Sequence, residues 1–188
     1  MKFGPTPWQT VGPFFGPALV APGLDVLADS HTRGQRIFIE GQVLDGDRSP
    51  VPDALIEIWQ ANAVGCYDHP EDPRQDKALD PAFHGFGRAG TDKSGCFRFA
   101  TIKPGPVPGV DGGLQAPHIN VSLFARGLLR RLTTRIYFPY EELNASDPVL
   151  KLLPEPRRAS LIVKQVAKGR FRFDILLQGD DETVFLEI

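Results

Sequence analysis

The sequence predicts an all-β protein, a single-domain β-sandwich with long loops. Eighteen prolines and nineteen glycines are spread, without low complexity, between short runs rich in β-branched and aromatic residues. This spacing is typical of many short strands joined by turns. The chain has 188 residues, which is enough for one sizeable core but too few for two. We therefore expect one sandwich domain over residues 36–188, preceded by an extended N-terminal arm.

The arm covers residues 1–35 in this prediction, because repeated prolines interrupt it and disfavour a helix. It carries apolar side chains that include Trp8, Phe14 and Phe15. Large exposed apolar patches are uncommon on monomers, so the arm must lie on protein. Two interpretations stay open: the arm wraps its own domain, or it docks on another subunit.

Nine segments have the alternating pattern or the residue content of strands. They are residues 36–43, 54–59, 86–91, 96–101, 115–124, 131–138, 160–166, 170–177 and 183–187. The first two read as a hairpin-like start, because a turn rich in Asp, Gly and Pro separates them. A short helical patch is expected near 140–153, after Pro139. Two long loops, at 68–85 and 103–113, are expected at one end of the sandwich, where long loops are commonly functional.

The strand at 115–124 carries the most informative pattern in the chain. Strand side chains alternate, so His118 and Asn120 share one face, while Ile119 and Val121 share the other. A second histidine at position 120 would make a strong metal-binding signature, because both imidazoles could reach one ion. The asparagine leaves half of such a site.

Composition excludes several classes of function. The formal net charge is only −2, so we expect no nucleic-acid partner. The two cysteines, Cys66 and Cys96, are too few for a disulfide framework. No signal-peptide pattern or membrane-length apolar run is found, so we expect a cytoplasmic protein with no membrane contact. The sequence motifs of zinc hydrolases, serine hydrolases and phosphate-binding loops are also absent.

Tyrosines and histidines are the remaining candidates for chemistry. Ferric iron prefers anionic oxygen ligands together with imidazole. Only Tyr67, in a loop, and His118, on a strand, stand in plausible positions. From residue type alone, a structural role is the commoner fate of each.

Five longer motifs follow one another along the chain: IWQANA at 58–63, FGR at 86–88, TIKPGP at 101–106, APHINVSLFARG at 116–127 and RIYF at 135–138. In sequence and in order, these motifs together resemble those of the intradiol ring-cleaving dioxygenases. The resemblance covers nearly the whole chain. Within this family, the motifs most resemble those of the alpha chains of members that are built from paired alpha and beta subunits.

The resemblance implies a β-sandwich and a ferric ion held by two tyrosinates and two histidines. The implied reaction is the O2-dependent opening of protocatechuate to 3-carboxy-cis,cis-muconate. When the pattern of a catalytic chain is aligned with this sequence, its four iron ligands fall at Tyr67, Val107, His118 and Asn120, and its catalytic arginine falls at Gln115. Because two ligands and the arginine are missing, we expect a vestigial site with no metal and no catalytic residue in this chain. Val107→Tyr with Asn120→His would restore the four-ligand set.

The resemblance also implies a partner. A catalytic beta subunit of the same family would hold the Fe(III), and alpha-beta pairs would build a larger assembly. This chain would lend Thr10, Gly12, Pro13, Phe14 and Arg135 to the partner's substrate site. Arg135 would attract the substrate carboxylate. Phe14 stands where a tyrosine is common in the family.

Two rival interpretations remain. The first is a self-sufficient homomeric intradiol enzyme, in which other tyrosines and histidines complete the site. Its candidate ligands are Tyr137, Tyr140, His69 and His84. The second is a non-catalytic β-sandwich binding module whose apolar arm only wraps its own domain.

Overall fold

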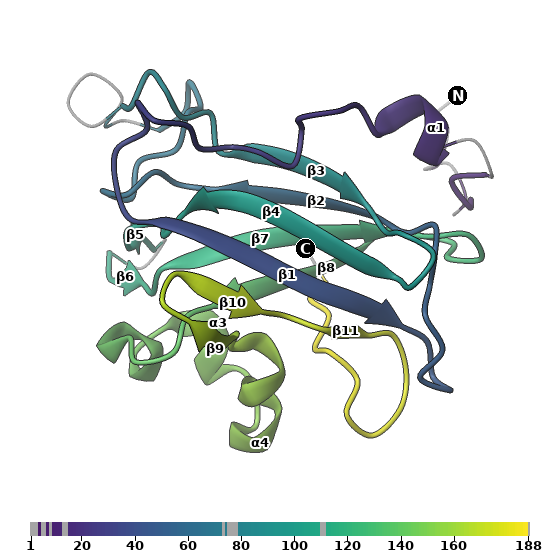
Figure 1. Cartoon of the computed structure of the whole chain (residues 1–188). Coiled ribbons are helices and arrows are strands. Elements are labelled where there is room, and N and C mark those ends of the chain that lie inside the picture. Colours follow the sequence, from purple (N-terminus) through teal and green to yellow (C-terminus); the bar gives the residue numbers. More distant parts are fainter. Residues whose placement is uncertain are drawn as a thin grey trace.

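Two β-sheets packed face to face make up the chain, as the all-β prediction requires (Figure 1). The structure is a computed structural model that describes residues 4, 7, 9–12, 15–72, 74, 79–109 and 112–187. The short helices α3 (Pro148–Lys151) and α4 (Glu155–Arg158) lie next to β9 (Lys164–Ala167) and β10 (Arg170–Arg172) (Figure 1). No helix in the described part of the chain combines the length and the apolar character needed to cross a membrane.

The first sheet is built on β1 (Arg36–Leu44). One side of β1 pairs antiparallel with β4 (Cys96–Ile102), and the other side pairs parallel with β10 (Arg170–Arg172) and then β11 (Ile175–Leu176). β9 (Lys164–Ala167) forms the edge next to β10. Between β10 and β11 the chain comes so close that a Cβ on Gly41 would collide with the Phe173 carbonyl group. Glycine at position 41 therefore permits this close approach.

The second sheet is antiparallel throughout, in the order β3 (Phe86–Gly90), β2 (Leu55–Gln60), β7 (His118–Phe124) and β8 (Leu132–Tyr137). The expected hairpin of the first two strands is therefore wrong, because β1 and β2 lie in opposite sheets. A turn-rich sequence indicates where a strand ends but does not specify which strand it will pair with.

The core lies between the sheets. Alternate residues of β1 point inward, among them Ile37 and Ile39, and alternate residues of β7, among them Ile119 and Val121, meet them from the other side. All four side chains are essentially inaccessible to solvent. The predicted alternation of β7 is confirmed, and it leaves His118 and Asn120 on the outer face.

From Leu24 onward the arm lies on its own domain. The Leu24 carbonyl accepts the amide of Arg88 on β3 at 2.8 Å, and the amide of Leu27 donates to Ala100 on β4 at 2.8 Å. The Ala100 amide in turn donates to the main-chain carbonyl of Asp25 at 2.8 Å. This part of the arm bridges the open edge between the two sheets, so the wrapping interpretation is confirmed for residues 24–27.

Three details differ from the sequence prediction. The arm contains a short helix, α1 (Phe15–Leu19), which tolerates Pro17 because amides of a first turn need no helical partner. The loop at 103–113 holds a two-residue ladder between β5 (Val107–Pro108) and β6 (Leu114–Gln115). The expected strand at 183–187 is not a strand; the segment makes isolated backbone bonds, such as that from Leu186 to Thr133 at 2.7 Å.

The helical patch is confirmed and extends beyond its predicted end. It comprises η1 (Glu142–Ala145), α3 (Pro148–Lys151), α4 (Glu155–Arg158) and η2 (Ala159–Leu161). Of these, η2 occupies the start of the predicted strand at 160–166, which shortens to β9. Leu150 and Leu161 of this patch pack on Ala116 and Tyr137 in a second, smaller core. That small core lies directly behind the start of β7.

Candidate functional site

The outer face of the second sheet, at the start of β7, gathers most of the residues singled out by the sequence. In the strand register Asn120 lies between Trp59 of β2 and Arg135 of β8. Two residues earlier, His118 lies opposite Tyr137. The long loop and the β5–β6 ladder adjoin this end of the sheet (Figure 1).

His118 is buried, with 3% of its surface exposed. Its Nδ1 lies 2.7 Å from the carbonyl oxygen of Ala116, and a carbonyl only accepts, so Nδ1 carries the hydrogen. The pKa of His118 is lowered from 6.5 to about 4, first by burial and then by the charge of Arg135. The imidazole is therefore neutral at physiological pH.

This low pKa predicts a pH-dependent stability. Below about pH 6.5 the unfolded chain protonates His118 while the folded chain does not, so the unfolded state binds more protons. The free energy of unfolding should therefore fall between pH 6.5 and pH 4, by up to about 3 kcal/mol. Urea unfolding at several pH values measures this. The slope should be smaller for His118→Gln; an unchanged slope in that variant would assign the effect to other groups.

Tyr67 holds a neutral phenol. Its ring stacks on Trp59, with centroids 5.8 Å apart and planes 15° from parallel. Burial raises the pKa of Tyr67, and the charge of Arg135 and a hydrogen bond from Asn120 only partly oppose this rise. The main-chain amide of Tyr67 donates to Asp72 at 2.9 Å, which fixes the loop that carries the ring.

Val107 and Asn120 offer no metal ligand. Val107 is buried and has no donor atom; it lies opposite Gln115 in the β5–β6 ladder. The Asn120 carbonyl oxygen already accepts from Nε of Arg135 at 3.0 Å. Its amide nitrogen donates to the Trp59 carbonyl at 3.4 Å.

Arg135 lies within this cluster, whereas the sequence interpretation assigned it to the partner's substrate site and not to the vestigial site. Besides Asn120, its guanidinium donates to Gln115 Oε1 at 2.8 Å and to the Tyr137 hydroxyl at 3.3 Å. The side chain is half-buried. No carboxylate among the described residues forms an ion pair with it within 4.0 Å. A positive charge therefore stands among positions 67, 118 and 120. Whether Arg135 also reaches a partner's pocket stays a prediction.

Asp147 supports the cluster from behind and was missed by the sequence interpretation. It is fully buried. Its Oδ1 accepts from the Tyr137 hydroxyl at 3.0 Å and from the amides of Val149 and Leu150 at 2.9 and 3.0 Å. Its Oδ2 accepts from the Ala116 amide at 2.9 Å. An aspartate directly before Pro148 is a helix N-cap signature, so the sequence did carry a signal for this role.

A cavity of about 460 Å³ adjoins the cluster. Two of its residues, Asp72 and Arg74, form an ion pair at 2.7 Å, which holds the pKa of Asp72 at about 2. Its walls combine stacked aromatic rings, apolar residues and the loop after β2. They are Trp59, Tyr67, His69, Glu71, Asp72, Arg74, Val107 and Pro108.

The four aligned positions do not fit a ferric ion. They supply one neutral phenol, one imidazole nitrogen, a valine and an asparagine whose oxygen is bound to a guanidinium. This set has too few anionic donors for Fe(III). In addition, no group of three or more His, Cys, Asp and Glu side chains in the described part of the chain could hold a metal ion.

The rival ligand set is not assembled either. Tyr140 is 93% exposed, and His84 is exposed and lies 2.6 Å from Asp68. Tyr137 adjoins His118 but donates its hydroxyl hydrogen to Asp147. Of the four candidates only His69 lines the cavity with Tyr67.

The arm residues assigned to a partner's site lie apart from this cluster where they are described. Thr10 is exposed and Gly12 is half-buried. Pro13 and Phe14 lie outside the described residues.

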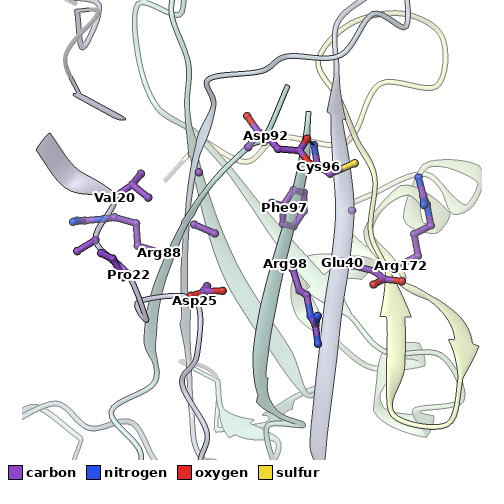
Figure 2. A pocket seen from close by; sticks show the side chains of 15 residues that line it. Val20, Pro22, Asp25, Glu40, Arg88, Asp92, Cys96, Phe97, Arg98 and Arg172 are labelled. Atoms are coloured by element: carbon purple, nitrogen blue, oxygen red, sulfur yellow. Dashed lines mark hydrogen bonds between the residues drawn. The ribbon is translucent and has the colours of Figure 1, made fainter. Parts of the chain in front are cut away.

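A larger cavity, of about 830 Å³, opens on another part of the surface, between the arm, β3, β4 and β1. In Figure 2, Val20 and Arg88 lie on one side of it, and Arg98 and Arg172 lie on the other. Each arginine is engaged. Arg88 pairs with Glu57 at 2.6 Å, Arg172 pairs with Asp174 at 2.8 Å, and Arg98 stacks over the Phe38 ring at 4.5 Å.

Comparisons with known proteins agree with the fold and the site. Residues 11–179 match the family model described as Dioxygenase. The chain is 40% identical to the protocatechuate 3,4-dioxygenase alpha chain of Burkholderia cepacia, over 97% of both chains. It is 43% identical to the beta chain from the same organism, over 80% of this chain and 67% of that one. A solved dioxygenase domain from Streptomyces sp. SirexAA-E covers 93% of this chain, with a TM-score of 0.65 and 31% identity.

Proposed function

We propose, from the premise that this chain belongs to the intradiol dioxygenase family, that it is the iron-free alpha-type subunit of a hetero-oligomeric enzyme. Its partner would be a beta-type chain of the same family that holds the Fe(III). The complex would open protocatechuate with O2 to give 3-carboxy-cis,cis-muconate, as part of aromatic compound catabolism in the cytoplasm. Assembly of alpha-beta pairs into a larger oligomer is part of the proposal.

One observation carries the proposal: two of the four positions that align with the family's metal ligands, Val107 and Asn120, lack a ligand, and Asn120 is bound by Arg135. A chain of this family that cannot hold the iron needs another chain for the chemistry. The match to an alpha chain over almost its full length supports this, whereas the match to the beta chain covers only 67% of the latter. The homomeric rival is disfavoured because Tyr140 and His84 face solvent.

The arm is the proposed contribution to the partner's pocket. Thr10, Gly12, Pro13 and Phe14 would border the substrate there, exclude water and limit its orientations, which can lower a barrier by several kcal/mol. Arg135 is the remaining candidate for contact with the substrate carboxylate. Its position among Gln115 and Asn120 means that such contact would require the partner's pocket to open beside β8.

Co-expression with a beta-type chain tests the proposal. We expect the two chains to purify together, contain iron and consume O2 with protocatechuate, while each preparation of this chain alone shows no ring-opening activity. Ring opening by this chain alone would support the homomeric rival. If this chain neither binds a beta-type partner nor changes that partner's activity, the result would support the binding-module rival.

A further inference from the structure

The guanidinium of Arg135 lies beside the residues that align with metal ligands and binds one of them, Asn120. Its Nε donates to Asn120, at one of the four aligned positions, and one terminal nitrogen donates to Gln115 and to the Tyr137 hydroxyl. The charge is also close enough to Tyr67 and His118 to act on both side chains. Arg135 therefore contacts one of the four aligned positions directly and acts by its charge on two others.

Within the described part of the chain, the hydrogen-bond partners of this arginine are all neutral groups. The amide oxygens of Gln115 and Asn120 and the tyrosine hydroxyl orient the guanidinium without cancelling its charge. Arg74 provides the contrast: it lies near Tyr67 as well, but Asp72 binds it through both carboxylate oxygens, at 2.9 and 2.7 Å. Arg135 thus has no direct carboxylate partner among the described residues, since Asp147 is linked to it only through the Tyr137 hydroxyl, and Gln115 and Asn120 hold the guanidinium in place.

We infer that Arg135 takes the place of a metal cation in this chain and keeps metal ions out by charge, in addition to the loss of two ligands. The inference rests on the proposed function only for the choice of positions 67, 107, 118 and 120 as the family's ligand positions. It has a consequence that the missing ligands alone do not have. Restoring the ligands at 107 and 120 is not sufficient for metal binding, because the guanidinium remains anchored by Gln115 and Tyr137.

The test compares ferric iron binding by variants of the full chain that all carry Val107→Tyr and Asn120→His. One variant keeps Arg135, one adds Arg135→Met and one adds Arg135→Lys. Met is similar in length and uncharged, whereas Lys keeps the charge and loses the planar donor geometry. Arg74→Met combined with Asp72→Asn in the same background is the matched control, because it removes a nearby arginine together with the carboxylate that balances its charge.

We expect the variant with Arg135→Met to bind Fe(III) at least about a hundredfold more tightly than the variants with Arg135 or Arg135→Lys. The variant with Arg74→Met and Asp72→Asn should not improve binding, because the local net charge is unchanged. Metal analysis after desalting and the visible tyrosinate-to-iron absorption band report iron without any assay of activity. Circular dichroism and thermal unfolding establish that each variant is folded, and Arg135→Gln replaces Arg135→Met if the latter does not fold.

Three outcomes would overturn the inference: iron binding as tight with Arg135 retained as with Arg135→Met, no gain in a folded uncharged variant, or an equal gain from Arg74→Met combined with Asp72→Asn. None of them depends on a partner chain. They are therefore separate from a failure of the proposed subunit function, which the co-expression experiment detects.

Discussion

Asp147→Ala is expected to lower the free energy of unfolding by about 3–5 kcal/mol. The carboxylate is fully buried and accepts four hydrogen bonds: from the Tyr137 hydroxyl and from the amides of Ala116, Val149 and Leu150. Its removal leaves several buried donors unsatisfied at once, where each costs about 1–3 kcal/mol. Urea unfolding of the variant and the native chain measures the loss.

Asp147→Asn is the matched control, because it keeps one carbonyl acceptor and nearly the same shape. We expect a smaller loss from it than from alanine. Tyr137→Phe should remove only the hydroxyl contact and cost less than either. A loss below about 1 kcal/mol for Asp147→Ala would mean that water or a rearranged helix α3 satisfies the freed donors.

Removal of residues 1–14 is expected to reduce kcat/KM of the mixed complex by roughly a hundredfold or more while this chain stays folded. The contacts that attach the arm to its own domain are made later in the chain, by residues such as Leu24 and Leu27. The removed segment contains the four residues proposed to border the partner's substrate. Steady-state kinetics with protocatechuate and size-exclusion chromatography of the complex measure the two effects separately.

A shorter truncation, of residues 1–8, is the control for the arm. It keeps Thr10, Gly12, Pro13 and Phe14, so the complex should retain most of its activity. Full activity after removal of residues 1–14 would place the substrate pocket away from the arm. Loss of the complex itself would show that the arm acts in assembly.

The alternation of β7 could be predicted from the sequence, because a strand with one buried face constrains every second residue. The shared face of His118 and Asn120 followed directly from this pattern and is confirmed. The assignment of β1 and β2 to one hairpin was wrong, since local turn signals do not encode which sheet a strand enters. The segment at 183–187 has the residue content of a strand but makes only scattered backbone bonds to Leu176 and Thr133.

The site was only partly predictable for a related reason. The sequence indicated that Val107 and Asn120 cannot bind iron, because residue type alone decides that. It did not indicate that Arg135 contacts Gln115 and Asn120, which are 20 and 15 positions away. That contact depends on the register between β7 and β8 and on the short ladder that positions Gln115. Pairwise register is set by the whole sheet and cannot be read from one strand.

The iron content of this chain on its own tests the central claim most directly. The full chain is incubated with Fe(III), desalted and analysed for metal, and its visible absorption is recorded beside a beta-type chain treated in the same way. We predict iron well below one atom per chain and no tyrosinate-to-iron absorption band, because one neutral phenol, one imidazole and a guanidinium cannot hold the ion. One bound ferric ion per chain, with the visible band, would contradict the account.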